Sequence, residues 1–358
     1  MPMRRVRFLA LALSVSLWSS AVDAVAAAPA PKPLSAMDRQ RVRVLAGKFR
    51  RAEDDAARMG VADELLAFGP AGAAALFDAA DRTIDPLVRR YRADLLAATR
   101  EVLRRRFEAD GQEKLEALQD TLRSLGADGG LTKEKIKAEG DPALEKLQQR
   151  LVILPEEVLQ AGTDLQAQRD RLLALGVHRQ RAADYLRQHA PEAKDALPDP
   201  RPFEEVLRDH EALSGLLAVA RTDDHRHILI DNAETAREVQ PEEARGIRRM
   251  NRIRILAGLK PLRIDVRLCD AARDHSTDMV EKKFFAHDSP VPGKKTLWAR
   301  AKRFGTTAHA ENIAAGTATG AGAIRQWFHS PGHHKNMMGG HRRVGLGRHK
   351  KTWTLLFG

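Results

Sequence analysis

The sequence predicts an α+β protein in which a long, all-helical region precedes a shorter region that mixes helices and strands. Apolar residues recur every three or four positions through most of residues 35–220, which is the period of a helix face packed on a core. Strand-type alternation is nearly absent before residue 225 and is found only close to residue 358. At 358 residues the chain is long enough for two domains, each with its own core.

The first residues are typical of an export signal. Three arginines precede an apolar run over residues 8–18, and residues 22–24 fit a small-x-small cleavage pattern. We therefore expect residues 1–24 to be a signal peptide and residues 25–34 to be a flexible segment. The mature protein is then exported, extracellular or periplasmic, at the cell envelope. An uncleaved N-terminal anchor is the alternative. No later segment has the roughly 20 apolar residues that a membrane span requires.

Three apolar stripes predict helices that pack on one another within residues 35–220. They cover residues 88–102, 115–125 and 144–154, each with 3-4 spacing. No chemical motif accompanies these stripes. We interpret them as the core of an all-helical domain.

Glycine- and proline-rich stretches predict where helices end. Residues 126–130 and 140–142 are expected to break the helical region, and the four prolines of residues 190–202 predict a stiff linker or an inter-helix connection. A further helix is expected over residues 203–220. Residues 221–245 are expected to be a linker that leads into a new helix start.

The C-terminal domain is expected over residues 246–358. Helices are predicted from about 242 to 256 and from about 266 to 282, because both segments place apolar residues on one face. Ser330-Pro331 predicts another helix start, with Ser330 as the cap. Alternation in residues 344–347 and 353–357 predicts two strands.

Cys269, the one cysteine, excludes an internal disulfide and lies in a helical apolar pattern, so we interpret it as buried.

The positive charge is concentrated in the C-terminal domain. Residues 246–358 contain 22 Lys and Arg against 7 Asp and Glu, or +15, while the rest of the chain carries −3. Anionic envelope polymers, lipids or peptides are therefore the expected partners. Nucleic acid is not expected, because the export signal is present and aromatic interleaving is absent. A soluble basic surface without a dedicated partner is the alternative.

Three strings in the C-terminal domain occur in a characteristic order. They are Phe-Phe-Ala-His-Asp-Ser-Pro at 284–290, Ala-Glu-Asn-Ile-Ala-Ala-Gly at 310–316 and Trp-Phe-His-Ser-Pro-Gly-His-His-Lys-Asn at 327–336. Over residues 245–358 the chain resembles the bacterial branch of the CAP superfamily of cysteine-rich secretory, antigen 5 and pathogenesis-related proteins. A further family pattern is matched by Leu262, Asp265, Leu268, Ala271, Ala272, His275, Ser276, Asp278 and Met279. The resemblance implies a three-layer α-β-α sandwich (the SCP domain fold) with a cleft above the sheet.

The resemblance also implies a site in that cleft. It assigns His287 and His333 as a metal-coordinating pair and Glu311 as the carboxylate beside them. Two neutral imidazoles and a carboxylate, completed by solvent, suit a divalent cation such as zinc. A hydrogen-bonded network that only ties three loops together is the alternative, and His334 is the alternative to His333. The cleft residues expected around the metal are Glu311, Asn312, Ser330 and His334.

Two departures from the family pattern bear on catalysis. Ser330 stands where eukaryotic members have a glutamate, so one candidate general base is missing. Ala310 stands where a glycine is usual, at a cost of about 1 kcal/mol if the backbone is left-handed there. We therefore favour a binding module that captures an envelope-associated ligand. A metal-assisted hydrolase with Glu311 as base is the second hypothesis, and a structural protein whose helical region binds the partner is the third. Whether the chain is an enzyme stays open.

Overall fold

The computed structural model describes residues 34–110, 112–125, 130–152, 157–159, 163–190 and 201–358. The predicted signal peptide, nearly all of the predicted flexible segment and most of the proline-rich linker lie outside these ranges. No helix in these ranges has both the length and the apolar character needed to cross a membrane. The main elements in chain order are α1 (Ala36–Arg51), α2 (Asp55–Leu66), α3 (Gly69–Asp110), α4 (Gln112–Ser124), α5 (Lys133–Lys135), η1 (Ile136–Gly140), α6 (Asp141–Leu151), α8 (Thr163–His189), α9 (Phe203–Val219), α10 (Asp223–Thr235), η3 (Ala236–Glu238), α11 (Pro241–Leu256), β1 (Arg263–Ile264), α12 (Val266–Glu281), α13 (Leu297–Arg303), β2 (Ala310–Ala315), α14 (Gly320–Phe328), α15 (Pro331–Met338), β3 (Arg343–His349) and β4 (Thr352–Phe357).

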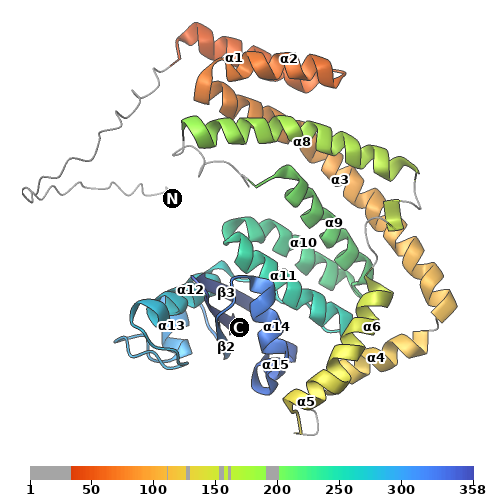
Figure 1. The fold of residues 1–358 in the computed structure, drawn as a ribbon, viewed down its shortest axis with the longest axis vertical. Coiled ribbons are helices and arrows are strands. Elements are labelled where there is room, and N and C mark those ends of the chain that lie inside the picture. Colours follow the sequence, from red (N-terminus) through yellow and green to blue (C-terminus); the bar gives the residue numbers. More distant parts are fainter. Residues whose placement is uncertain (1–33, 111, 126–129, 153–156, 160–162, 191–200) are drawn as a thin grey trace, which may run out of the picture.

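The N-terminal region is a curved array of helices (Figure 1). The long helix α3 packs along α8 and also contacts α9. Its predicted stripe is buried at Val88, Tyr91 and Leu95, which join one apolar cluster with Leu172 and Leu175 of α8. The described part of residues 34–220 contains no strand, which confirms the prediction of an all-helical region.

Two expectations about breaks are wrong. Residues 140–142 do not separate helices, because the π-helical η1 runs directly into α6 at Asp141. Pro142 follows the π-helical turn, whose Ile136 carbonyl accepts from the Asp141 N–H, and it stands at the start of α6. Residues 221–245 are not a linker either. They carry α10, which begins at a Thr222 cap that accepts from the His225 N–H, and then η3.

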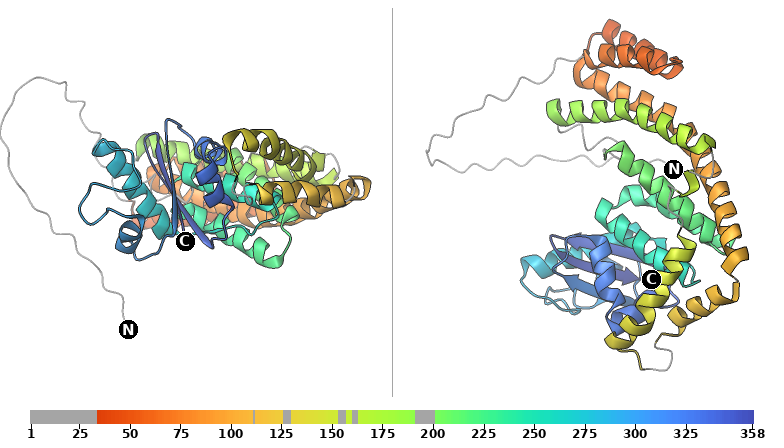
Figure 2. Two further views of the ribbon diagram at one scale, coloured as in Figure 1. Left: turned by 90° about the horizontal axis from the view of Figure 1, so that it is seen from below. Right: turned by 45° about the vertical axis from the view of Figure 1, so that its right-hand side comes forward.

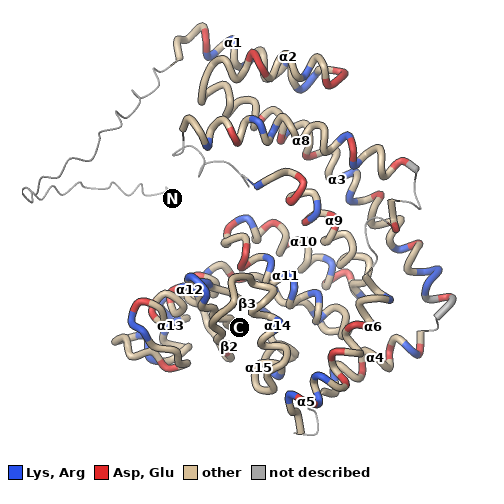
Figure 3. The backbone as a smooth tube through the Cα atoms, viewed as in Figure 1, with Lys and Arg blue, Asp and Glu red and all other residues tan. Residues whose placement is uncertain are grey.

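The C-terminal region is built on a four-stranded sheet of order β1-β3-β4-β2. β1 pairs with β3 in parallel, and β3–β4 and β4–β2 are antiparallel. Helix α12 packs on β3 and β4, whereas α11 packs on β3 and both α14 and α15 pack on β2. The strands therefore lie between helices on two sides (Figure 2, left view), as the expected three-layer sandwich requires. Charged residues are spread over the helices of both the helical region and the sandwich (Figure 3).

Glycines in β3 allow α12 to approach the sheet closely. A Cβ at Gly347 would lie 2.0 Å from the backbone nitrogen of Arg273, and one at Gly345 would lie 2.2 Å from the backbone carbon of Leu268. Neither neighbour is a flexible side-chain end, so the helix itself would have to move. Small side chains in β3 are therefore a condition of the sandwich.

We expect Gly347→Ala to destabilise the protein by about 3 kcal/mol, at the upper end of the usual overpacking range. Gly340→Ala is the matched control, because a Cβ there meets no atom within 4 Å. Thermal unfolding of both variants measures the difference. Equal melting temperatures for the two variants would contradict the close approach.

The helical region and the sandwich share one continuous apolar cluster. It joins Leu144 and Leu147 of α6 to Ile324, Trp327 and Phe328 of α14. Polar contacts reinforce the junction, since Gln119 Nε2 donates to the Leu256 carbonyl at 3.0 Å. The predicted boundary at residues 221–245 therefore crosses a packed interface, and the division of the chain into two domains there stays a prediction.

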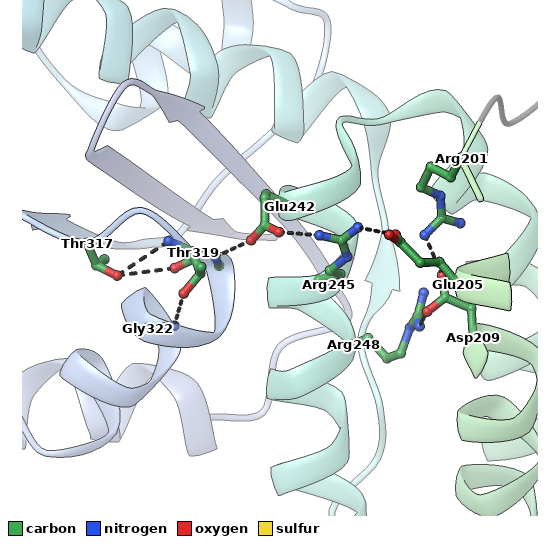
Figure 4. A network of polar contacts seen from close by, with 10 residues as sticks. Arg201, Glu205, Asp209, Glu242, Arg245, Arg248, Thr317, Thr319 and Gly322 are labelled. Carbon is green, nitrogen blue, oxygen red and sulfur yellow. Dashed lines mark hydrogen bonds and ion pairs between the residues drawn. The ribbon is translucent and has the colours of Figure 1, made fainter. Parts of the chain in front are cut away.

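A polar network also crosses this junction (Figure 4). Glu242 of α11 accepts from the backbone N–H of Gly320 at 2.9 Å, at the start of α14. Glu242 also pairs with Arg245, which reaches Glu205 on α9 at 3.3 Å. Helix α11 is thus bonded to the start of α14 on one side and to α9 of the helical region on the other.

Candidate metal and ligand cleft

Three different elements carry the predicted site residues. His287 lies in the loop between α12 and α13, Glu311 is the second residue of β2, and His333 lies in the first turn of α15. The loop is held in part by His275, which is buried and whose Nε2 lies 3.2 Å from the Ala286 carbonyl oxygen. His275 is therefore a packed structural residue, as the sequence indicates.

The predicted histidines and carboxylate come together. His287 Nδ1 donates to Glu311 Oε1 at 2.9 Å, and the ring centroids of His287 and His333 are 6.4 Å apart. The His287 side chain is 56% exposed and that of Glu311 only 1%. His287 therefore lies at the surface and His333 is partly buried, with the carboxylate beneath His287.

Arg300 is the residue that sequence reasoning missed. Its side chain is fully buried on α13 and its Nη2 donates to Glu311 Oε2, while its Nη1 donates to the carbonyls of Lys294 and Lys295 at 3.1 Å. Both oxygens of Glu311 are thus occupied, one by an imidazole and one by a guanidinium. The sequence carries no local signal for this burial, because neighbouring side chains on a helix point about 100° apart and the adjacent Ala301 does not define the face of Arg300.

The electrostatics of the three groups are unequal. The hydrogen bond to Glu311 raises the pKa of His287 above its usual 6.5. Burial lowers the pKa of His333, and the nearby charge of protonated His287 lowers it further. Burial pushes the pKa of Glu311 upward, but the His287 hydrogen bond and the Arg300 charge outweigh it, so that pKa is lowered overall. At neutral pH Glu311 is a buried anion that orients His287.

Amide side chains fix the relative positions of β2 and α15. Asn312 Nδ2 donates to the His333 carbonyl at 3.1 Å, and Asn336 Nδ2 donates to Asn312 Oδ1 at 2.9 Å. Trp327 Nε1 donates to the Ile313 carbonyl at 2.9 Å. Asn312 is buried, so its role is to position the backbone that carries His333.

The other predicted cleft residues occupy different surroundings. Ser330 is the N-cap of α15 but makes no side-chain capping bond; its carbonyl accepts from the His334 N–H at 2.7 Å. His334 is fully buried, with its ring 4.7 Å from that of Phe328 and its Nδ1 2.7 Å from the Phe328 carbonyl oxygen. The ring of His334 is therefore part of the core, and His333 is the histidine beside His287.

Two further sequence inferences are resolved by the fold. Ala310 begins β2 and does not have a positive φ, so alanine carries no left-handed strain there. Cys269 is fully buried, and burial raises the pKa of its thiol to about 12, as expected for a core residue.

The side chains present fit a cation site with two histidine ligands better than a site with three protein ligands. Among the described residues, no group of three or more His, Cys, Asp or Glu side chains is arranged to hold a metal. His333 Nδ1 is buried without a hydrogen-bond partner, and Glu311 already orients His287 as a carboxylate does behind a metal-binding histidine. His287 and His333 would supply the protein ligands, and solvent or a bound molecule would supply the rest.

Comparison with known proteins supports the sequence resemblance in this region. Residues 247–355 match the family described as "Cysteine-rich secretory protein family", CAP. The chain is 36% identical over 103 residues to "Uncharacterized protein YkwD" of Bacillus subtilis, covering 28% of this chain and 40% of that protein. It is 31% identical over 108 residues to "Uncharacterized membrane protein YlbC" of the same organism, covering 30% and 31%. The chain thus spans less than half of either relative.

A solved structure is also similar to this chain. It is a crystal structure of an extracellular protein containing an SCP domain from Bacillus anthracis, 32% identical in sequence. The match covers 33% of this chain and 40% of that one, with a TM-score of 0.31.

Proposed function

Because residues 247–355 form a CAP domain, we propose that this chain is an exported binding module whose His287–His333 cleft takes a divalent cation and an anionic ligand of the cell envelope. The observation that carries the proposal is the facing pair of imidazoles, one of them oriented by a buried carboxylate. Export rests on the signal-like residues 1–24. Imidazole ligands suit zinc as well as copper, iron and nickel, and zinc is the cation that we propose here.

Positive charge beside the cleft supports an anionic ligand. An open hollow of about 520 Å³ is lined by Lys133, Lys137 and His329 together with Ser330 and Pro331. Ser330 and Pro331 stand at the start of α15, the helix that carries His333, so the hollow and the proposed cation site share that helix. Figure 3 shows α5, which carries Lys133, next to α15. The helical region thereby contributes two lysines to a hollow at the start of α15.

Exposed aromatic side chains lie on the same segment as the cleft residues. Phe285, two residues before His287, is 54% exposed, and Trp298, two residues before Arg300, is 59% exposed. Aromatic side chains are enriched where proteins bind partners. They would supply apolar contact to a ligand whose anionic groups are held by the lysines.

The surroundings of Glu311 weigh against the hydrolase hypothesis. A general base needs a free, accessible oxygen within reach of the attacking water. Both oxygens of Glu311 are engaged, by His287 and Arg300, and the side chain is buried. Glu311 is better suited to positioning His287 than to removing a proton.

The test of ligand binding uses the mature protein and a poly(glycerol phosphate) probe, with neutral dextran as the uncharged control. We expect Lys133→Ala/Lys137→Ala to weaken phosphate-polymer binding about tenfold, since two cationic contacts are lost. Lys114→Ala is the matched control, because this lysine is exposed on α4 and does not line the hollow. Unchanged binding in the double variant, or equal binding of dextran, would show that the hollow does not recognise anions.

The pH profile of cation binding should follow His287. A ligating imidazole must be unprotonated, and Glu311 stabilises the protonated form of His287, so protons compete there first as pH falls. We therefore expect zinc affinity to begin falling above pH 6.5, at the raised pKa of His287. In Glu311→Gln the midpoint should shift to lower pH. Titrations between pH 5.5 and 8.5 measure this, and a wild-type midpoint below 6.5 would contradict the assigned His287–Glu311 bond.

A further inference from the structure

The junction between the helical region and the sandwich encloses a second hollow, separate from the His287 cleft. Its volume is about 440 Å³, within the range of small-molecule sites. It is formed by α9, α10, η3, α11 and β1, so most of its wall precedes the CAP match at residue 247. The residues used below that line it are Arg201, Asp209, His210, Asn232, Ala233, Arg237, Val239, Ala244, Arg248 and Asn251.

The interior of this junction cavity is apolar. Leucine, valine, isoleucine, alanine and proline side chains from α9, α10 and α11 make up most of its wall. The two asparagines in the wall are already satisfied: Asn232 Nδ2 donates to the Leu262 carbonyl at 2.8 Å, and Asn251 Nδ2 donates to the same carbonyl at 2.9 Å. Their carbonyl oxygens accept from the N–H groups of Ile264 and Leu262. A ligand body in the cavity therefore meets carbon, with no unmet polar group to satisfy.

Charged side chains gather at one side of the same cavity. Asp209 is shared between Arg201, at 2.9 Å, and Arg248 (Figure 4). Arg237 adds a further positive charge from η3, where its side chain is exposed. Three arginines against one aspartate leave a net charge of +2 on the lining. The Arg201, Asp209 and Arg248 side chains are 22 to 29% exposed, so this charged group reaches solvent and marks the entrance.

His210 lines the cavity and feels the charges of Arg237, Asp209 and Arg248. Burial, together with the positive charges of Arg92 and Arg237, lowers the pKa of His210 to about 4. The imidazole is therefore neutral at physiological pH and available as a hydrogen-bond donor to an anion without adding charge of its own. The lining thus combines a desolvated donor, a cationic rim and an apolar body.

We infer that the junction cavity binds a single-chain amphiphilic acid, with its anionic head at Arg237 and His210 and its apolar chain along Ala233, Val239 and Ala244. Charge complementarity selects an anion over a cation, and the apolar wall selects a hydrocarbon body over a fully polar anion. The site would hold such a molecule between α10 of the helical region and α11 of the sandwich, so that occupancy strengthens the contact between the two. This inference does not depend on cation binding at His287 and His333.

The test is calorimetric titration of the mature protein with decanoate, with decyl phosphate, and with decyltrimethylammonium as the cationic probe of equal chain length. We expect both anions to bind at one site and the cation to bind at least tenfold more weakly. Decanoate and decyl phosphate separate a carboxylic from a phosphoric acid head. If neither anion binds below its aggregation concentration, or if the cation binds as well as the anions, the inference is overturned.

Two variants locate the binding. Arg237→Glu reverses a rim charge on an exposed side chain, and Ala244→Phe fills the interior; each should weaken decanoate binding at least tenfold. The matched control is Arg208→Glu, since Arg208 is exposed on α9, pairs with Glu204 and does not line the cavity. Arg237→Glu keeps the test decisive if Ala244→Phe fails to fold. Equal weakening by Arg208→Glu, or none by Arg237→Glu, would assign the binding to general surface charge.

Discussion

Zinc titrated into the mature protein at pH 7.5 should bind at one site, and both His287→Ala and His333→Ala should abolish that binding. Two imidazole ligands give a sparse site, so we expect a dissociation constant of about 1 μM, or about −8 kcal/mol. Removing one ligand leaves a single imidazole, which cannot hold the ion against solvent. The expected loss is therefore complete within the range of calorimetry, and it is the largest binding effect predicted for this protein.

The control for this experiment is His309→Ala. His309 is an exposed histidine of the same domain, on the loop before β2. Its backbone N–H donates to the Phe357 carbonyl at 2.7 Å. Its loss should leave zinc binding unchanged. Both cleft variants should fold normally, because His287 is largely exposed and His333 is half-buried at a helix start. Absence of binding by the wild type, or full binding by a double variant, would leave the His287–Glu311–His333 cluster a purely structural network.

The elements that the sequence predicted well are those whose signals are local. The 3-4 stripes of α3 and α6 report which face of each helix is buried, and the structure buries those faces. The alternation near the C-terminus predicted where β3 and β4 form, although both faces of these strands are buried. The convergence of His287, Glu311 and His333 was not a local signal. It came from three motifs whose order resembles a known family, and the structure brings the three residues together.

What could not be predicted depends on contacts distant in the sequence. Arg300 has the composition of an ordinary basic surface residue, and only its pairing with Glu311 across α13 and β2 explains its burial. His334 was expected among the cleft residues beside His333. Helical geometry turns adjacent side chains by about 100°, so the ring of His334 enters the core instead. Lys133 of α5 and Lys137 of η1 meet Ser330 and Pro331 only through the packing of the helical region, which has no counterpart in the family resemblance.

Glu311→Gln should lower the free energy of unfolding by about 3 to 5 kcal/mol, the cost of leaving a buried charge without its partner. The Arg300 guanidinium is fully buried, and although its Nη1 keeps its two carbonyl acceptors, its Nη2 would lose the carboxylate. The reverse change, Arg300→Met, should cost at least as much, because it leaves the Glu311 carboxylate buried with only His287. The double variant should recover part of the loss, since an uncharged pair no longer requires compensation. Urea unfolding of the four proteins gives the coupling energy directly.

The pH dependence distinguishes a charge effect from a packing effect in this cycle. The pKa of Glu311 is lowered by folding, so its contribution to stability is present above its unfolded value of 4.5 and is lost as pH falls through the lower folded value. The difference between wild type and Glu311→Gln should therefore grow as pH falls through the raised pKa of His287, whose protonated form Glu311 stabilises, and should shrink only below about pH 4.5. Asp78→Asn is the control, because Asp78 pairs with Arg82 on the exposed face of α3 and should change stability by less than about 1 kcal/mol. An effect of Glu311→Gln no larger than that control would mean that water reaches the Arg300–Glu311 pair and that His287 is oriented without a buried anion beneath it.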